Sequence, residues 1–189
     1  MDVKDAVVVA KGVLDKKVCE DILKRKEEWY WFSGNWYQYG KKGSDGKMDN
    51  TFRDANYTKT LADEDFQKIL QETLIKSTRI YDEHVPLFRM GIDLATEIKI
   101  HRYEVGNCIE RHRDHIHSIF DGEKKGIPVL SFVGLLSDDF EGGEFIMFDD
   151  YKVDLEAGDI VMFPSCFLYP HQVTTVTKGT RYSFVAWGF

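Results

Sequence analysis

The stretch TEIKIHRYEVGNCIERHRD, residues 96–114, marks the point where the hydrophobic pattern of the chain changes. From Thr96 onward, apolar and polar side chains alternate with a period of two, which is typical of a β-strand. Further strands are predicted downstream at about residues 129–136, 144–148, 159–163, 171–177 and 180–187. Turn signals rich in Gly and Asp separate these strands, and short strands with close turns indicate a jelly roll, sandwich or barrel.

The first half of the chain has a mixed pattern. Asp15 can cap a helix that runs to about Trp29, and helical spacing predicts a second helix from about Asp63 to Tyr81. We expect both helices to pack on the outer face of one sheet, which makes the fold a β-rich α+β jelly roll.

Between the helices lies an aromatic run from Trp29 to Tyr39, followed by a Gly/Lys-rich loop around Gly40–Lys47. The run is interpreted as strand and core, and a peptide-binding groove is the alternative. The length of 189 residues fits one domain, in which residues 1–94 support a catalytic core of residues 95–189.

The balance of 25 basic against 32 acidic side chains gives a net charge of −7, which disfavours a nucleic-acid partner. Three dispersed cysteines predict no disulfide framework. The N-terminal apolar run is too short for a signal or a membrane span. We therefore expect a cytoplasmic protein that is not bound to a membrane.

His112 and Asp114 are two residues apart, so on a strand their side chains would face the same side. A His-x-Asp triplet occurs by chance in about one chain of this length in five, so the pair alone indicates little. His171 begins a later predicted strand, and in a jelly roll distant strands become neighbours. Two His and one carboxylate form the site typical of non-haem Fe(II), although a strand-end histidine bonded to the backbone is the simpler interpretation of His171.

Arg181 follows His171 by ten residues, beyond a tight turn predicted at Lys178-Gly179. An arginine within an apolar strand is costly unless it pairs with an anion, and its planar group suits a carboxylate. Alternation alone leaves open whether Arg181 faces inward or outward.

Four segments carry a family resemblance, in order: HRYEVGNCIERHRD (101–114), LSFVGLLSDDFEGGEFIMF (130–148), VDLEAGDIVMFPS (153–165) and PHQVTTVTKGTRYSFVAWGF (170–189). They resemble the Fe(II)/2-oxoglutarate dioxygenases of the prolyl 4-hydroxylase and PKHD type. The resemblance covers roughly residues 96–189 and implies a double-stranded β-helix.

The same resemblance implies Fe(II) and 2-oxoglutarate as cofactors, with ascorbate as a further one. It implies no catalytic residue beyond the metal ligands. The implied metal ligands are His112, Asp114 and His171, and the implied residues around 2-oxoglutarate are Arg181, Tyr103 and Trp187. His101, His115 and His117 are weaker candidates for a place in or near the ligand set.

The implied reaction is hydroxylation of a C–H bond, first of a prolyl residue in a protein or peptide, with release of succinate and CO2. Two alternatives stay open. One is a 2-oxoglutarate oxygenase that acts on a free amino acid or another small molecule. The other is a non-catalytic, cupin-like metal-binding jelly roll.

Overall fold

The computed structural model describes residues 2–33, 56–59, 64–86, 91–92, 95–114 and 127–189. The predicted loop Gly40–Lys47, residues 34–39 of the aromatic run, and His115 and His117 lie outside the described residues. Within those ranges, the structure has no helix with the length and apolar character needed to cross a membrane.

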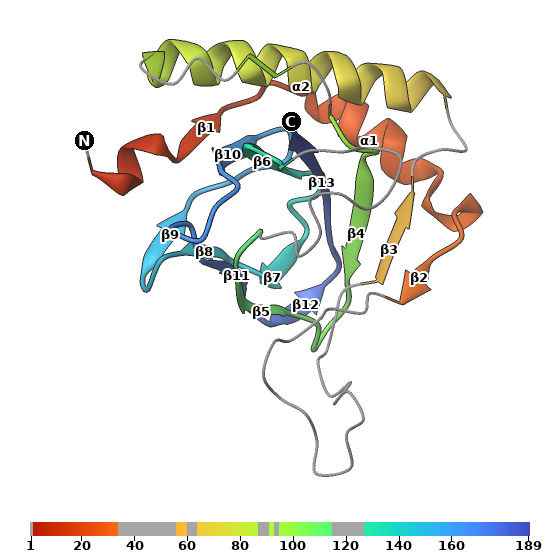
Figure 1. Ribbon diagram of the computed structural model, residues 1–189. Coiled ribbons are helices and arrows are strands. Elements are labelled where there is room, and N and C mark those ends of the chain that lie inside the picture. Colours follow the sequence, from red (N-terminus) through yellow and green to blue (C-terminus); the bar gives the residue numbers. More distant parts are fainter. Residues whose placement is uncertain (1, 34–55, 60–63, 87–90, 93–94, 115–126) are drawn as a thin grey trace, which may run out of the picture.

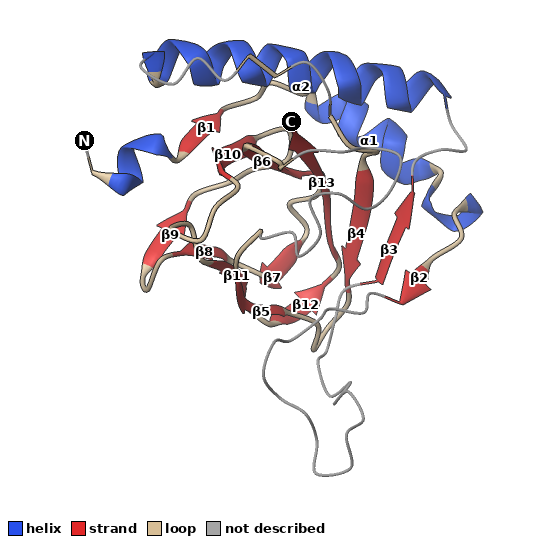
Figure 2. Ribbon diagram, in the orientation of Figure 1, coloured by secondary structure: helices blue, strands red, loops and turns tan. Residues whose placement is uncertain are grey.

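Two main sheets form the body of the protein (Figures 1 and 2). The larger sheet has seven strands in the order β1 (Val8–Ala10), β10 (Ile160–Pro164), β6 (Leu130–Leu135), β13 (Arg181–Gly188), β4 (Lys99–Tyr103), β3 (Asn56–Lys59) and β2 (Phe32–Ser33). The smaller sheet has the order β5 (Ile109–His112), β11 (His171–Val173), β8 (Phe145–Met147) and β9 (Tyr151–Val153). A two-stranded sheet joins β12 (Val176–Gly179) to β7 (Phe140–Gly142). All pairs are antiparallel, and the arrangement confirms the predicted jelly roll.

Two helices cover the outer face of the larger sheet, as the sequence predicts (Figure 1). Helix α1 (Lys16–Lys24) begins where expected, because the Asp15 side chain accepts a hydrogen bond from the Lys17 amide at 2.7 Å. The helix is shorter than predicted, since a short 3₁₀ helix, η2 (Lys26–Glu28), replaces its last turn. Helix α2 (Glu64–His84) matches its prediction within three residues at its C-terminal end. A second 3₁₀ helix, η1 (Val3–Ala6), precedes β1.

Strand alternation divides the buried side chains into two clusters. On β13, Tyr182, Phe184 and Ala186 belong to the cluster that faces the helices, while Val185 and Trp187 belong to the cluster between the sheets. The position of Arg181 follows from this period of two. Its side chain faces the space between the sheets and is 1% exposed, so the outward-facing alternative is wrong.

Two details of the strand prediction are wrong. The predicted strand 171–177 is two strands, β11 and β12, which belong to different sheets. Lys178-Gly179 is not a turn between neighbouring strands but the end of β12, and β13 continues in the larger sheet. Gly179 has a φ of +71°, and a Cβ there would lie 2.2 Å from the Asp139 carbonyl oxygen. The glycine therefore permits a bend between two sheets.

Gly134, on β6 of the larger sheet, leaves no room for a side chain. It lies opposite Phe184 on β13, and a Cβ at this glycine would come within 2.2 Å of the Phe184 ring. Gly134→Ala is expected to lower the free energy of unfolding by about 1–3 kcal/mol, because the buried ring must move. Urea denaturation would measure the loss. Adding Phe184→Leu should recover part of it, whereas additive losses would contradict this packing argument.

Candidate metal centre

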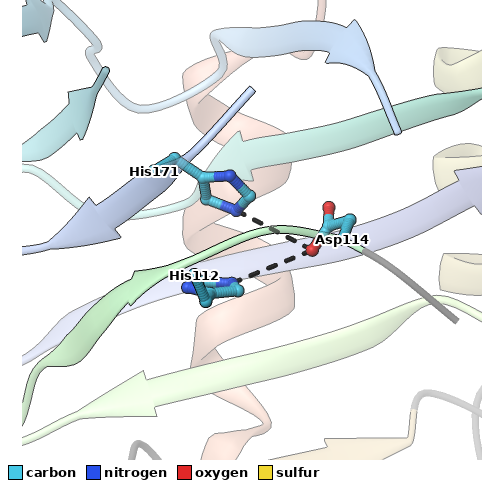
Figure 3. Close-up of side chains that lie close together, drawn as sticks. All are labelled: His112, Asp114 and His171. Carbon is cyan, nitrogen blue, oxygen red and sulfur yellow. Dashed lines mark ion pairs between the residues drawn. The ribbon is translucent and has the colours of Figure 1, made fainter. Parts of the chain in front are cut away.

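Two paired strands bring three potential metal ligands together. His112 ends β5 and lies opposite His171, the first residue of β11, while Asp114 follows His112 by two residues. The Asp114 Oδ1 atom is 3.8 Å from the Nε2 atom of each histidine, as Figure 3 shows. One ligand atom from each residue lies within 4.8 Å of the others, which is the spacing of atoms around a single ion. Elsewhere in the described part of the chain, no second group of three or more His, Cys, Asp or Glu side chains has this spacing.

The backbone fixes the tautomer of both imidazoles. The Nδ1 atom of His112 lies 2.8 Å from the Glu110 carbonyl oxygen, and that of His171 lies 3.1 Å from the Tyr169 carbonyl oxygen. A carbonyl only accepts, so both Nδ1 atoms donate. Each Nε2 atom therefore carries a lone pair toward Asp114, the arrangement that metal-binding histidines require.

Charge in the cluster also suits a cation. Burial and the neighbouring His171 lower the pKa of His112 to about 4, so this imidazole is unprotonated at neutral pH. Burial raises the pKa of Asp114, but the two histidines and hydrogen bonds from Ser131 and Trp187 outweigh it, and the pKa lies below its ordinary value. The cluster thus offers a neutral imidazole at His112 and an anionic carboxylate at Asp114, with His171 as the third donor.

The two hydrogen bonds that the described residues make to the Asp114 carboxylate both reach its Oδ2 atom. Ser131 Oγ donates to Oδ2 at 2.6 Å, and the Trp187 indole Nε1 donates to the same oxygen at 2.9 Å. Oδ1 remains toward the histidines. Reasoning from the sequence assigned no role to Ser131, and the signal that could have identified it is a lone hydroxyl in the apolar strand LSFVGLL.

The three residues line a pocket between the two sheets, and its empty space of about 390 Å³ includes volume that is open to solvent. Its walls are mostly apolar, with Phe132, Val133, Phe145 and Val185 among them. Tyr103 and Trp187 line the pocket, and so does His101, whose Nδ1 atom is 3.3 Å from the Tyr103 hydroxyl. A small, largely apolar cavity with a few polar groups is typical of a ligand site.

Arg181 lies behind Tyr103, with its guanidinium carbon 5.1 Å from the centre of that ring. It donates to Ser183 Oγ at 2.8 Å, but its buried Nε has no hydrogen-bond partner. No carboxylate of the described residues forms an ion pair with it. Burial lowers the pKa of Arg181 from its ordinary value. A buried guanidinium without a carboxylate partner provides a site for an anion. Its parallel N–H donors fit the two oxygens of a carboxylate.

Protonation of His101 should make folding pH-dependent. Burial, with a smaller contribution from Arg181, lowers the pKa of His101 to about 3. An unfolded histidine titrates near about 6.5, so between these values the unfolded chain binds more protons, and stability is lost as pH falls. The thermal midpoint of the metal-free protein should drop between about pH 7 and about pH 5. His101→Gln should show a smaller drop, and an equal drop in both proteins would contradict this origin.

Three comparisons with known proteins bear on this site. The model of the 2OG-Fe(II) oxygenase superfamily matches residues 98–189, which include all six predicted site residues. A PKHD-type hydroxylase of Idiomarina loihiensis, IL0759, is 37% identical over 96 residues, covering 49% of this chain and 42% of that protein. A PKHD-type hydroxylase of Acinetobacter baumannii, A1S_0473, is 28% identical over 184 residues, covering 93% of this chain and 74% of that protein.

Among solved structures, a prolyl hydroxylase of Trichoplax adhaerens, in complex with a peptide fragment of the hypoxia inducible factor oxygen degradation domain, has a similar fold. The TM-score is 0.69 at 16% sequence identity, covering 98% of this chain and 84% of that chain. At this identity the likeness concerns the fold alone. It extends over the helices and both sheets, beyond the half of the chain that the superfamily match covers.

Proposed function

We propose that this chain, whose residues 98–189 match the 2OG-Fe(II) oxygenase superfamily, is an oxygenase of that superfamily and hydroxylates a prolyl residue of a protein or peptide. The observation that supports this most is the combination of His112, Asp114 and His171 with the buried guanidinium of Arg181, which has no carboxylate partner among the described residues. The first group suits Fe(II), and the second suits the carboxylate of a keto acid.

In this proposal His112 Nε2, His171 Nε2 and Asp114 Oδ1 hold Fe(II). Bound there, Fe(II) supplies the redox chemistry that activates dioxygen, which amino-acid side chains lack. The contribution of the chain is to present three donors from one side, which leaves other positions open to co-substrate and oxygen. The apolar walls of the pocket limit the access of water.

Arg181 and Tyr103 anchor 2-oxoglutarate by the carboxylate remote from the metal. The guanidinium binds this carboxylate, and Tyr103, whose ring packs 5.1 Å from it, shields the pair from water. Fixing one end of the co-substrate orients its keto group toward the ligand cluster. In the overall reaction one oxygen atom of O2 enters the hydroxyl product and the other enters succinate, while 2-oxoglutarate loses CO2.

The prolyl substrate is proposed from the relatives. The Trichoplax prolyl hydroxylase was solved with a peptide, and the two sequence relatives are PKHD-type hydroxylases. The superfamily match covers residues 98–189 only, so it does not identify residues before this range that would contact a peptide.

The test is turnover with Fe(II), 2-oxoglutarate and a panel of proline-containing peptides. The proposal predicts succinate formation together with a mass increase of about 16 Da on a proline, which is one oxygen atom inserted. Succinate formed with a free amino acid, and with no peptide, would move the substrate to the small-molecule class. Absence of succinate in every reaction would favour a non-catalytic jelly roll.

A further inference from the structure

We infer that Ser131, Ser165 and Trp187 are positioning residues that restrict Asp114 to binding the metal through one oxygen. This inference rests on the proposed function, because it assigns Asp114 as a ligand. It adds residues that neither touch the metal nor belong to the ligand set.

Two donors occupy the same carboxylate oxygen. Ser131 Oγ is 2.6 Å and Trp187 Nε1 is 2.9 Å from Asp114 Oδ2, while Oδ1 is 3.8 Å from both imidazole Nε2 atoms. Two hydrogen bonds use the lone pairs of Oδ2. Turning Oδ2 toward an ion would break both bonds within a largely buried site, so the carboxylate is restricted to one metal-facing oxygen.

Ser165 fixes the direction of the Ser131 hydroxyl. Ser131 has a single hydroxyl hydrogen, which it gives to Asp114, so in its 2.7 Å contact with Ser165 it accepts. The two serines are 1% and 6% exposed, so water does not easily replace either partner. The series of hydrogen bonds therefore runs from the Ser165 hydroxyl through the Ser131 hydroxyl to the Asp114 carboxylate.

The donors stand on the rigid centre of the larger sheet. Ser131 on β6 and Trp187 on β13 are directly paired, so both reach the same face at the same level. Asp114 lies two residues past the end of β5 and gains a fixed orientation from the sheet opposite. Such support orients a ligand before the metal arrives.

The segment from Ser165 to Pro170 supports a second ligand. It begins at Ser165, which acts on Asp114 through Ser131, and its Tyr169 carbonyl accepts the Nδ1 hydrogen of His171. One short connection between β10 and β11 thus orients two of the three metal-binding side chains from outside.

Binding of Co(II) to the metal-free protein under argon tests the inference without turnover. Calorimetry gives the affinity, and the visible absorption of Co(II) reports the number and geometry of its ligands. Ser131→Ala and Trp187→Phe are each expected to lower the affinity roughly 10- to 100-fold, the usual effect of losing a partner of a ligand, and to change the absorption band. Ser137→Ala, a buried serine that bonds the Tyr182 amide away from the pocket, and Trp29→Phe, on the helix side, are matched controls and should leave both readouts unchanged.

A double variant distinguishes positioning from general loosening. Ser165 acts only through Ser131, so Ser165→Ala should weaken Co(II) binding in the wild type but add nothing to Ser131→Ala. Circular dichroism and thermal unfolding of the metal-free variants confirm that they are folded. Additive losses would contradict the chain of hydroxyls.

The two hypotheses fail in different ways. Co(II) affinities within about threefold of wild type and unchanged bands in both Ser131→Ala and Trp187→Phe would overturn the positioning role alone, since loss of a ligand's partner has a larger effect. Failure of the wild type to bind Co(II) in the calorimeter would contradict the proposed function and this assignment with it.

Discussion

The His112→Ala variant is expected to lose tight Fe(II) binding and all succinate production while it keeps the wild-type fold. Two donors, Asp114 Oδ1 and His171 Nε2, would remain. Two ligands bind the ion less tightly than three. The fold should persist, because the His112 side chain is 23% exposed and the main chain of β5 makes the sheet contacts.

Anaerobic titration with Fe(II) and a succinate assay measure the two losses. His84→Ala is a matched control, because His84 is exposed at the end of α2, where its Nδ1 atom lies 3.0 Å from the Ile80 carbonyl oxygen of the same helix. It should bind and turn over as the wild type does. Succinate production by His112→Ala at the wild-type rate would remove His112 from the ligand set.

Arg181→Ala is expected to weaken 2-oxoglutarate binding by about 2–5 kcal/mol, the cost of removing one partner of a buried charge pair. This corresponds to a rise in Kd of roughly 30- to 4000-fold. Arg181→Lys keeps the charge but loses the planar fork, so an intermediate Kd is expected. Fe(II) affinity should change little, since Arg181 contacts Tyr103 and Ser183 rather than the metal ligands.

Titration of the Fe(II) protein with 2-oxoglutarate under argon gives the Kd. Arg25→Ala removes an exposed arginine that pairs with Glu28 on the helix side, and it should leave the Kd unchanged. A near-normal Kd in Arg181→Ala would show that another residue holds the carboxylate.

The sequence predicted the features that depend on the period of apolar residues and on the spacing of particular side chains along the chain. Alternation from Thr96 predicted the strands, and an Asp before an amphipathic stretch predicted the start of α1. His112 and Asp114 were singled out by their spacing of two, His171 by its place at the start of a later strand, and Arg181 as a costly charge in an apolar strand. The family resemblance implied their roles. Their roles remain proposals, although the structure places the first three around one point.

The features that the sequence did not predict depend on tertiary contacts. Strands β1, β7 and β9 have three residues each, too short to show a period. Residues 171–177 divide at Thr174 and Thr175, which belong to neither strand, and the two parts pair with different sheets. Ser131 and Ser165 are 34 residues apart, and only the packing of β6 beside β10 brings their hydroxyls within 2.7 Å.

The most direct test of the central claim is the visible spectrum of the protein with Fe(II) and 2-oxoglutarate in the absence of oxygen. A keto acid chelated to Fe(II) gives a weak charge-transfer band, which neither component gives alone. The account predicts this band in the wild type, its absence in His112→Ala, and its appearance in Arg181→Ala only at much higher 2-oxoglutarate. A wild-type protein that binds Fe(II) yet shows no band at any 2-oxoglutarate concentration would contradict the account.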